Sequence, residues 1–287
     1  MSQNSPSLRS LRARSNSFQM PVRIWPMTVF PILQTGFFAL SCYFVTWNPA
    51  CTAACILASS LALNFTIHIS VHELLHYSDR QPLPVWMNMV ISAVSGLSFD
   101  AYRFHHHNHH RHNNGLGDYS KTWRMSPRGP TAYGVLRYAL SWPLQVVQTT
   151  QALRAEKRLN RPRMVHRRMR YENCSILTVL IVLGMCSWHF AVLYMLMVYL
   201  GWSLVSVHNY GQHPPGEFTN AASFTSSNLY NRLFFNNGLH HEHHAEPAKA
   251  SHELSPNLEA PQVAEPHLVS PFRRKLHREA TNVTSTP

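Results

Sequence analysis

The sequence predicts an all-α integral membrane protein in which two transmembrane helical hairpins, four spans in total, carry a cytoplasmic helical cap with a histidine-rich metal site. Two observations predict this fold class. Long uncharged apolar stretches alternate with very polar ones, although the hydrophobic fraction of the 287 residues is an ordinary 45%. In addition, fifteen of the 20 histidines fall in four short clusters, at 68–76, 105–112, 208–213 and 240–244.

The first two spans are predicted at residues 25–47 and 50–71. The first has 23 residues without a formal charge and a tryptophan at each end, which is long enough to cross about 30 Å of hydrocarbon. Asn48 and Pro49 predict a turn, and the 22 uncharged residues that follow predict a second crossing. Together the two stretches indicate a helical hairpin.

A third apolar run, at 174–207, predicts the second hairpin. Its 34 uncharged residues would extend about 50 Å as one helix, which is too long for one crossing, and an interruption near Ser187 indicates a tight turn. Residues 83–99 include Pro84 and indicate an interfacial or buried helix, whereas 133–152 predicts a helix along the surface. This assignment places all four histidine clusters on the same side of the bilayer.

Basic charge places that side in the cytoplasm. Residues 1–24 carry four arginines and no acid, and eight Lys/Arg occur among the 17 residues of 154–170. Excess Lys/Arg marks the cytoplasmic side, and the net charge of +12 fits juxtamembrane segments better than nucleic-acid binding, for which no motif is present. We therefore expect a disordered basic tail at 1–24, a membrane domain at 25–247 with its site facing the cytoplasm, and a cytoplasmic C-terminal tail at 248–287.

Histidine spacing within the clusters predicts metal ligands, since neutral imidazole is a common ligand for iron, zinc and copper. HELLH places His72 and His76 at i and i+4, on one face of a helix. HxxHH occurs twice, 134 residues apart, and each copy predicts three nitrogens for one ion. The triplets are His106, His109 and His110, and His240, His243 and His244. Two triplets indicate two metal ions, and a histidine of the 208–213 cluster could complete a coordination set.

The other histidines near these motifs are expected to be neighbours of the ligands or exposed side chains. They are His105, His107, His112, His208 and His241, and any of them could replace an assigned ligand. For example, His105, His109 and His112 also follow one helical face. His68, inside the second span, is expected to be a hydrogen-bonded core histidine.

The order of these motifs resembles the three histidine boxes, HExxH, HxxHH and HxxHH, of the integral-membrane fatty acid desaturases and their hydroxylase relatives. The resemblance covers residues 25–247, and HNYGQHPP is similar to the NYxxH element of membrane alkane hydroxylases. It implies a site with two iron ions and O₂ as co-substrate. The implied ligands are His72, His76, His106, His109, His110, His213, His240, His243 and His244.

Carboxylates and an amide beside the boxes are expected to support the ligands. Glu73, Asp100, Asp118 and Glu242 would accept the second N–H of ligating imidazoles and so fix their orientation. For Asp100 and Asp118, a helix cap or a salt bridge is the alternative. Asn237 would hydrogen-bond a bound water or ligand.

The resemblance implies O₂-dependent oxidation of a fatty acyl chain, with desaturation as the first expectation. A hydroxylase or an oxidative decarboxylase of the same superfamily is the alternative, because these reactions share the iron chemistry. Two electrons must come from an external ferredoxin or b-type cytochrome, since the chain has no dinucleotide fingerprint and its five cysteines lack iron–sulfur spacing. Residues 154–170 would steer an acidic donor, or simply anchor the chain.

Two other function classes fit parts of the pattern. An intramembrane zinc protease would use HELLH with Glu73 as general base, yet it needs only three protein ligands and leaves both triplets without a role. A metal transporter or storage protein would carry its histidines within the spans or in low-complexity loops. Here the histidines lie at the predicted span ends with fixed spacing.

Overall fold

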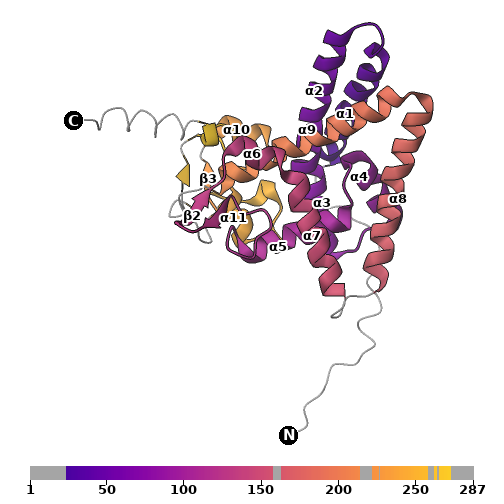
Figure 1. Cartoon of the computed structure of the whole chain (residues 1–287). Coiled ribbons are helices and arrows are strands. Elements are labelled where there is room, and N and C mark those ends of the chain that lie inside the picture. Colours follow the sequence, from indigo (N-terminus) through magenta and orange to yellow (C-terminus); the bar gives the residue numbers. More distant parts are fainter. Residues whose placement is uncertain are drawn as a thin grey trace.

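The computed structural model describes residues 24–157, 163–213, 222–225, 227–257, 262–263 and 265–272. The described chain is mostly helical, and four of its helices are long and apolar enough to cross a membrane (Figure 1). These candidate spans are Met27–Phe44, Pro49–Arg80, Val165–Cys186 and Trp188–Gln212. Their number agrees with the sequence, while the hairpin topology across a bilayer and the cytoplasmic cap stay predictions. The predicted N-terminal tail lies outside the described residues, apart from Ile24.

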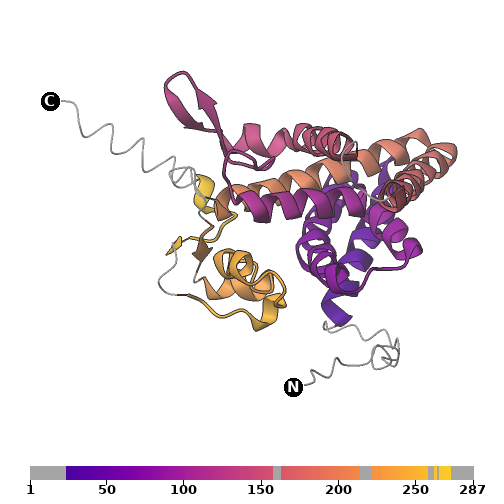
Figure 2. The ribbon, with the colours of Figure 1, turned by 90° about the horizontal axis from the view of Figure 1, so that it is seen from below.

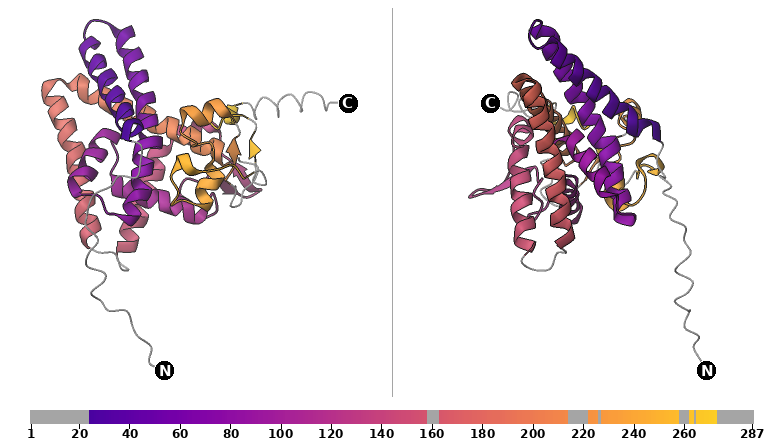
Figure 3. Two further views of the ribbon diagram at one scale, coloured as in Figure 1. Left: turned by 180° about the vertical axis from the view of Figure 1, so that it is seen from behind. Right: turned by 90° about the vertical axis from the view of Figure 1, so that its right-hand side faces the viewer.

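The first two helices lie side by side and project from one end of the molecule (Figures 1 and 3). α1 spans Ile24–Phe44 and α2 spans Pro49–Phe65. Asn48 caps α2, because its side chain accepts a hydrogen bond from Cys51 N at 3.0 Å. Pro49 then starts α2 at a position that needs no N–H donor. The turn between the helices therefore lies where the sequence predicts it.

α2 continues without a break into the first histidine box. A π-helical turn, η1 (Thr66–Val71), joins it to α3 (His72–Arg80), so that helix runs from Pro49 to Arg80. The sequence predicts that the span ends at Val71. The helix continues because residues 66–80 contain neither glycine nor proline, and Pro82 is the first residue that cannot extend it.

Two shorter helices lead from the first box to the second. α4 (Val85–Ser95) has 11 residues and is too short to cross a bilayer, as the sequence predicts. Gly96 ends α4 at φ +70°, where a Cβ atom would meet Val198 Cγ2 at 2.4 Å. α5 (Phe99–His112) carries the second box, and the Ser98 side chain caps its first turn.

A small hairpin and two helices follow α5. They are β1 (Trp123–Ser126), β2 (Gly129–Ala132), α6 (Val135–Leu140) and α7 (Trp142–Lys157). The two strands are antiparallel and project from the surface (Figure 2). The surface helix predicted at 133–152 is thus divided after Leu140, because Pro143 favours the first turn of a new helix over the interior of a longer one.

The second pair of long helices contains the remaining candidate spans. α8 spans Arg163–Cys186 and α9 spans Trp188–Gln212, with Ser187 between them in an extended conformation. The break lies where the sequence predicts it. α8 begins inside the basic segment, of which residues 158–162 lie outside the described residues. Figure 1 shows α8 standing at one side of the molecule, while α9 runs toward the C-terminal elements.

Short elements complete the chain after α9. They are β3 (Phe224–Thr225), α10 (Asn228–Leu233), α11 (His240–Ala245), η2 (Ser251–Glu253) and β4 (Gln262–Val263). β3 and β4 pair in parallel. His267 is fully buried, and a Cβ atom at Gly211 would overlap its carbonyl oxygen at 1.9 Å. Described parts of the predicted C-terminal tail therefore pack against the end of α9.

The long helices carry large apolar side chains on their outer faces. Ile32 of α1 is 67% exposed and Met185 of α8 is 83% exposed, and Leu57 and Leu177 are also exposed. Burying apolar surface stabilises a protein by about 25 cal/mol per Å², so faces of this kind are unfavourable in water. Contact with lipid removes that penalty, and the four candidate spans therefore indicate an integral membrane protein.

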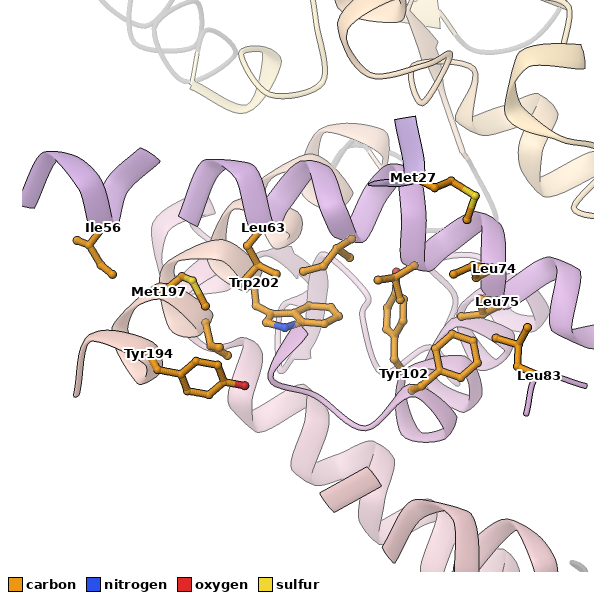
Figure 4. Close-up of a cluster of buried hydrophobic side chains, with 14 of the residues drawn as sticks. Met27, Ile56, Leu63, Leu74, Leu75, Leu83, Tyr102, Tyr194, Met197 and Trp202 are labelled. Atoms are coloured by element: carbon orange, nitrogen blue, oxygen red, sulfur yellow. The ribbon is translucent and has the colours of Figure 1, made fainter. Parts of the chain in front are cut away.

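The main hydrophobic core packs α2, α3, α5 and α9 together (Figure 4). Trp202 of α9 lies between Leu63 of α2 and Tyr102 of α5, and its indole N–H donates to Ser95 O at 2.8 Å. Gly201 allows this approach, because a Cβ atom there would meet Leu63 Cγ at 2.8 Å. The helices that carry the first two boxes are thus fixed to the last long helix.

A buried carboxylate fixes the start of α5 against α8. Glu172 accepts hydrogen bonds from Ser98 Oγ at 2.5 Å, Asn88 Nδ2 at 3.1 Å and Asp100 N at 3.1 Å. Asp100 in turn pairs with Arg168, whose Nε lies 3.1 Å from Asp100 Oδ2. Buried hydrogen bonds to a charged group are costly to break, so this network holds the second box in place.

Candidate metal centre

The nine histidines predicted as ligands converge into two adjacent groups. Cluster A consists of His72, His76, His106, His110 and His243. Cluster B consists of His109, His213, His240 and His244. The clusters touch where the rings of His110 and His244 stack with centroids 4.3 Å apart. Two metal ions bound here would be neighbours.

Each HxxHH triplet is divided between the clusters, which differs from the expectation of one ion per triplet. α5 gives His106 and His110 to cluster A and His109 to cluster B. α11 does the opposite, with His240 and His244 in cluster B and His243 in cluster A. Successive residues of a helix are about 100° apart, so i and i+4 share a face while i+3 turns aside.

Cluster B is a closed ring of four Nε2 atoms. His213 Nε2 lies 3.0 Å from His109 Nε2 and 3.0 Å from His240 Nε2. His244 Nε2 lies 3.2 Å from His109 Nε2 and 3.0 Å from His240 Nε2. The centre of a flat square with sides of about 3 Å is about 2.1 Å from each corner, which matches metal–imidazole bonds of about 2.0–2.1 Å.

In cluster A the Nε2 atoms lie at similar distances from one another, but they form a row with two ends instead of a closed ring. Its Nε2–Nε2 distances are 3.0 Å for His76–His106, 2.9 Å for His106–His110, 3.0 Å for His110–His243 and 3.1 Å for His243–His72. Ligands of one ion that sit at right angles are separated by about 3 Å, whereas tetrahedral ligands would be about 3.4 Å apart. Both clusters therefore suit an ion with more than four ligand positions.

Hydrogen bonding alone does not explain these contacts. A neutral imidazole has one N–H, so at most two of the four contacts in cluster B have a proton to share. Burial lowers the pKa of His240, His243 and His244 well below the ordinary value, and the neighbouring imidazoles lower it further. These three rings are therefore neutral, and each can present a lone pair to the centre of its own cluster, which is what a metal ion requires.

Asp118 lies against His109 of cluster B, the kind of partner that the sequence analysis expects for it. His109 Nδ1–H donates to Asp118 Oδ2 at 2.8 Å, which leaves the Nε2 lone pair for a metal. Ser120 binds the other oxygen through its amide and its hydroxyl, each at 2.7 Å. Burial alone would raise the pKa of Asp118, but the His109 and Ser120 contacts outweigh it and hold the pKa below its usual value.

The two glutamates inside the boxes do not orient imidazoles. Glu73 accepts hydrogen bonds from the amide and the hydroxyl of Ser251, and Glu242 accepts from Asn257 N at 2.6 Å. Both carboxylates therefore hold the segment that follows the last box. No local pattern indicates these contacts, because the partners lie 178 and 15 residues away in a segment expected to be a tail.

Asp100 and Asn237 also differ from their expected roles. Asp100 pairs with Arg168 and lies 3.9 Å from Arg103 Nη1, so the salt-bridge alternative holds for it. Asn237 accepts from Gln212 Nε2 through its carbonyl and its side chain, at 3.2 and 3.3 Å. It thereby fixes the residue before His213 rather than facing a ligand position.

Asp79 lies beside His76 of cluster A, although the sequence analysis did not single it out. Its Oδ2 lies 4.0 Å from His76 Nδ1, and its Oδ1 binds Arg103 at 2.8 Å and His107 at 3.0 Å. The signal was present, because Asp79 follows His76 by three residues and shares its helix face.

Four of the histidines that could replace an assigned ligand, His105, His107, His208 and His241, bind other partners within the described residues. His105 Nδ1 bonds Thr149 Oγ1 at 2.7 Å, His107 binds Asp79, and His241 Nδ1 lies 3.2 Å from Ala222 O. His208 bonds Tyr230 at 2.7 Å, and its ring lies 4.5 Å from that of His68. These side chains surround the clusters without joining them.

A pocket touches both clusters at once, through His106 and His109. Most of its walls come from α5, α7 and α9, which supply Tyr102, Trp142, Val146, Trp202 and Val205 and the polar side chains of Gln145 and Asn209. Leu97 before α5, Ser120 after it and Tyr138 of α6 complete the lining. No Asp, Glu, Lys or Arg lines it. A pocket with apolar and aromatic walls and no charge suits an alkyl chain beside the two ion positions.

The model of the fatty acid desaturase family matches residues 46–270 of this chain. The chain belongs to the fatty acid desaturase family. Its match includes all three boxes, His213 and most of the described C-terminal segment. A comparison with curated proteins gave no match. As a member of the fatty acid desaturase family with four candidate spans, the protein is an oxidoreductase of fatty acyl chains in a membrane, and its histidine groups are compatible with metal binding.

Proposed function

We propose that the protein is a membrane-bound non-haem di-iron enzyme that desaturates a fatty acyl chain with O₂. The observation that carries this proposal is the pair of adjacent imidazole clusters, one ligand of each lining the same uncharged pocket. Iron suits the right-angled ligand contacts, and cluster A and cluster B would each hold one ion. When bound, the two irons supply the O₂ activation that breaks an unactivated C–H bond.

The balance of the reaction defines what else must reach the site. Desaturation removes two hydrogens from adjacent carbons and reduces O₂ to two waters, which requires two electrons and two protons from outside. We propose a ferredoxin or b-type cytochrome as the donor, approaching from the cytoplasmic side. The basic start of α8 supports this, because exposed Arg167 and Arg170 suit an acidic partner.

The residues of the pocket bind and orient the acyl chain. Trp142 and Trp202 exclude water from the space beside His106, and their indole N–H groups are already used by Tyr199 O and Ser95 O. Their positions are therefore fixed, as a precise hydrogen abstraction needs. The lack of a Lys or Arg in the pocket disfavours decarboxylation, since nothing with a permanent charge would hold a substrate carboxylate there.

The geometry also disfavours the intramembrane zinc protease. A zinc protease would need Glu73 as a general base near one zinc, but the Glu73 carboxylate accepts hydrogen bonds from Ser251. It also leaves cluster B without a role. A hydroxylase remains the alternative, because hydroxylation and desaturation differ only in the fate of the second hydrogen.

Product analysis tests the proposal. The protein should be expressed with an electron donor, and the cellular lipids analysed by mass spectrometry. Loss of two hydrogen masses shows desaturation, and gain of one oxygen mass shows hydroxylation. An iron-loaded protein that yields neither product across several acyl substrates would contradict the proposal.

A pocket variant links the product to the site. Val146→Trp should narrow the pocket, lower turnover and shift the preference to shorter or thinner chains, while the metal content stays at the wild-type value. Val90→Trp is the matched control, because Val90 is 55% exposed on α4 and outside the pocket. Equal activity of both variants would place the substrate elsewhere.

A further inference from the structure

A second pocket opens onto cluster A and is chemically unlike the first. It touches His76 and His243, and its other lining residues include Glu73, Arg80, Lys249 and Glu253. Four charged side chains thus surround a route to cluster A, whereas the substrate pocket has none of these residue types. A hydrated ion crosses a charged passage at far lower cost than an apolar one.

The segment after the last box forms one wall of this charged pocket. Ala248, Lys249 and Ala250 line the pocket together with Glu253 of η2. The segment is held from three sides, because Glu73 accepts from Ser251, Arg80 donates to Ala248 O, and Asn236 Nδ2 donates to Ser251 O at 3.1 Å. These contacts connect it to α3 and to the loop before α11.

The segment is attached by few buried apolar contacts. Leu254 packs with Leu239 in a small cluster separate from the main core. Glu253 is exposed and Lys249 is half-buried. Segments with few apolar contacts and exposed hydrogen bonds open at low free-energy cost compared with global unfolding. Opening this segment would uncover His76 and His243, whereas none of the histidines of cluster B lines the pocket.

We propose that the charged pocket is the route by which metal ions reach and leave cluster A, and that the hydrogen bonds between Glu73 and Ser251 keep it closed. The carboxylates of Glu73 and Glu253 would attract a divalent cation, and His76 is the first ligand that it meets. This proposal rests on the two-metal site of the proposed function, and it concerns ion exchange rather than catalysis.

Metal extraction from the iron-loaded protein tests the route. Wild-type protein and Ser251→Ala would be incubated with EDTA, and the iron remaining per chain followed by elemental mass spectrometry. Ser251→Ala should release one of its two irons about tenfold faster or more, since it removes a hydrogen bond to a charged group, and the second iron at the wild-type rate. Ser251→Thr keeps the hydroxyl and should restore the slow rate.

A matched control removes a hydroxyl that does not line the charged pocket. Ser126→Ala acts in the β1–β2 hairpin, where Ser126 Oγ donates to Gly129 O, and should leave both release rates unchanged. Hydrogen–deuterium exchange gives a second measurement. Peptides covering 248–254 should exchange faster in Ser251→Ala and Glu73→Gln, whereas peptides of α5 should not.

Two outcomes would overturn the proposal: equal release rates in Ser251→Ala and the wild type, or equal acceleration of both irons. Faster exchange across α5 would likewise point to general loosening. The result is separable from the proposed function, because lipid products are measured independently. A protein that exchanges one ion selectively but oxidises no lipid would contradict the enzyme activity and leave the route intact.

Discussion

Cluster A and cluster B use the same ligand chemistry but differ in what surrounds them. In cluster B, His213 is fully buried and His109 is oriented by the buried carboxylate of Asp118 at 2.8 Å. In cluster A, the nearest carboxylate to His76 is that of Asp79, 4.0 Å away and 32% exposed. Cluster A also faces the charged pocket. Cluster B is therefore the more rigid position and cluster A the more accessible one.

The difference shows that the same two helices can contribute histidines to two clusters with unlike surroundings. α5 and α11 each contribute to both clusters, so the distance between the clusters is set by these two helices. The surroundings then come from separate elements, namely the loop with Asp118 for cluster B and the C-terminal segment for cluster A. The accessibility of one cluster can thus be changed without moving the other cluster.

The largest expected effect comes from removing a ligand of the rigid cluster. His213→Ala removes one of the four imidazoles of cluster B. The ion of cluster B should then fall to the detection limit, and lipid oxidation should fall to its detection limit as well. His241→Ala is the matched control, because His241 lies in the last box between members of both clusters but contacts Ala222 O. Metal content and product should be measured on the same preparations. If His241→Ala were as damaging as His213→Ala, the ligand assignment would be wrong.

The next largest effect is expected from the carboxylates that lie beside the two clusters. Asp118→Asn weakens the hydrogen bond that orients His109 and should lower metal affinity or activity about 10–100-fold. Asp79→Asn should have a smaller effect, since Asp79 is more exposed and 4.0 Å from His76. Metal titration of both variants gives the comparison. A larger effect for Asp79→Asn would reverse the ranking of the clusters.

Acid should destabilise the metal-free protein through both clusters. Burial and neighbouring rings lower the pKa of His106, His240 and His243, and the pKa of His110 falls to about 2. The unfolded chain takes up protons near pH 6.5, which the folded clusters exclude, so stability is retained above that pH and lost progressively below it. Thermal unfolding between pH 7.5 and 5.5 checks this. A flat profile would mean that the imidazoles are not buried together.

The smallest effect concerns electron delivery. Arg167→Glu with Arg170→Glu should slow reduction by an acidic donor a few-fold, and added salt should reduce the difference from wild type. Arg168 is left unchanged, although it belongs to the same basic segment, because it pairs with buried Asp100. Arg124→Glu with Arg128→Glu, both exposed on the β1–β2 hairpin, is the matched control. Equal slowing in both pairs would indicate a general charge effect instead of docking at α8.

Much of this arrangement follows from local patterns in the sequence. The lengths of the uncharged stretches predict the number of candidate spans. Asn48-Pro49 and Ser187 predict where the helices break, and the spacing of His72 and His76 predicts that they share one helix face. These signals act within a few residues, so they need no knowledge of the fold. The same holds for Asp118, which lies nine residues after His109.

The rest depends on contacts between distant segments. Spacing inside α5 or α11 separates the i and i+4 histidines from the third member of the triplet, but which histidines of the two helices meet depends on how α5 and α11 are placed relative to each other. The partners of Glu73 lie 178 residues away, and those of Glu172 lie 72 to 84 residues away. Such pairs emerge only when the core around Trp202 has brought the helices together.

The π turn at Thr66–Val71 determines which way the first box faces. One surplus residue shifts the angular phase of everything after it by about 100° relative to an uninterrupted α-helix. α2 can therefore pack against the core while His72 and His76 face the other histidines of cluster A, although α2 and α3 belong to one continuous helix. Deleting a single residue there would point both imidazoles of the box away from the other members of cluster A, although neither histidine would be lost from the chain.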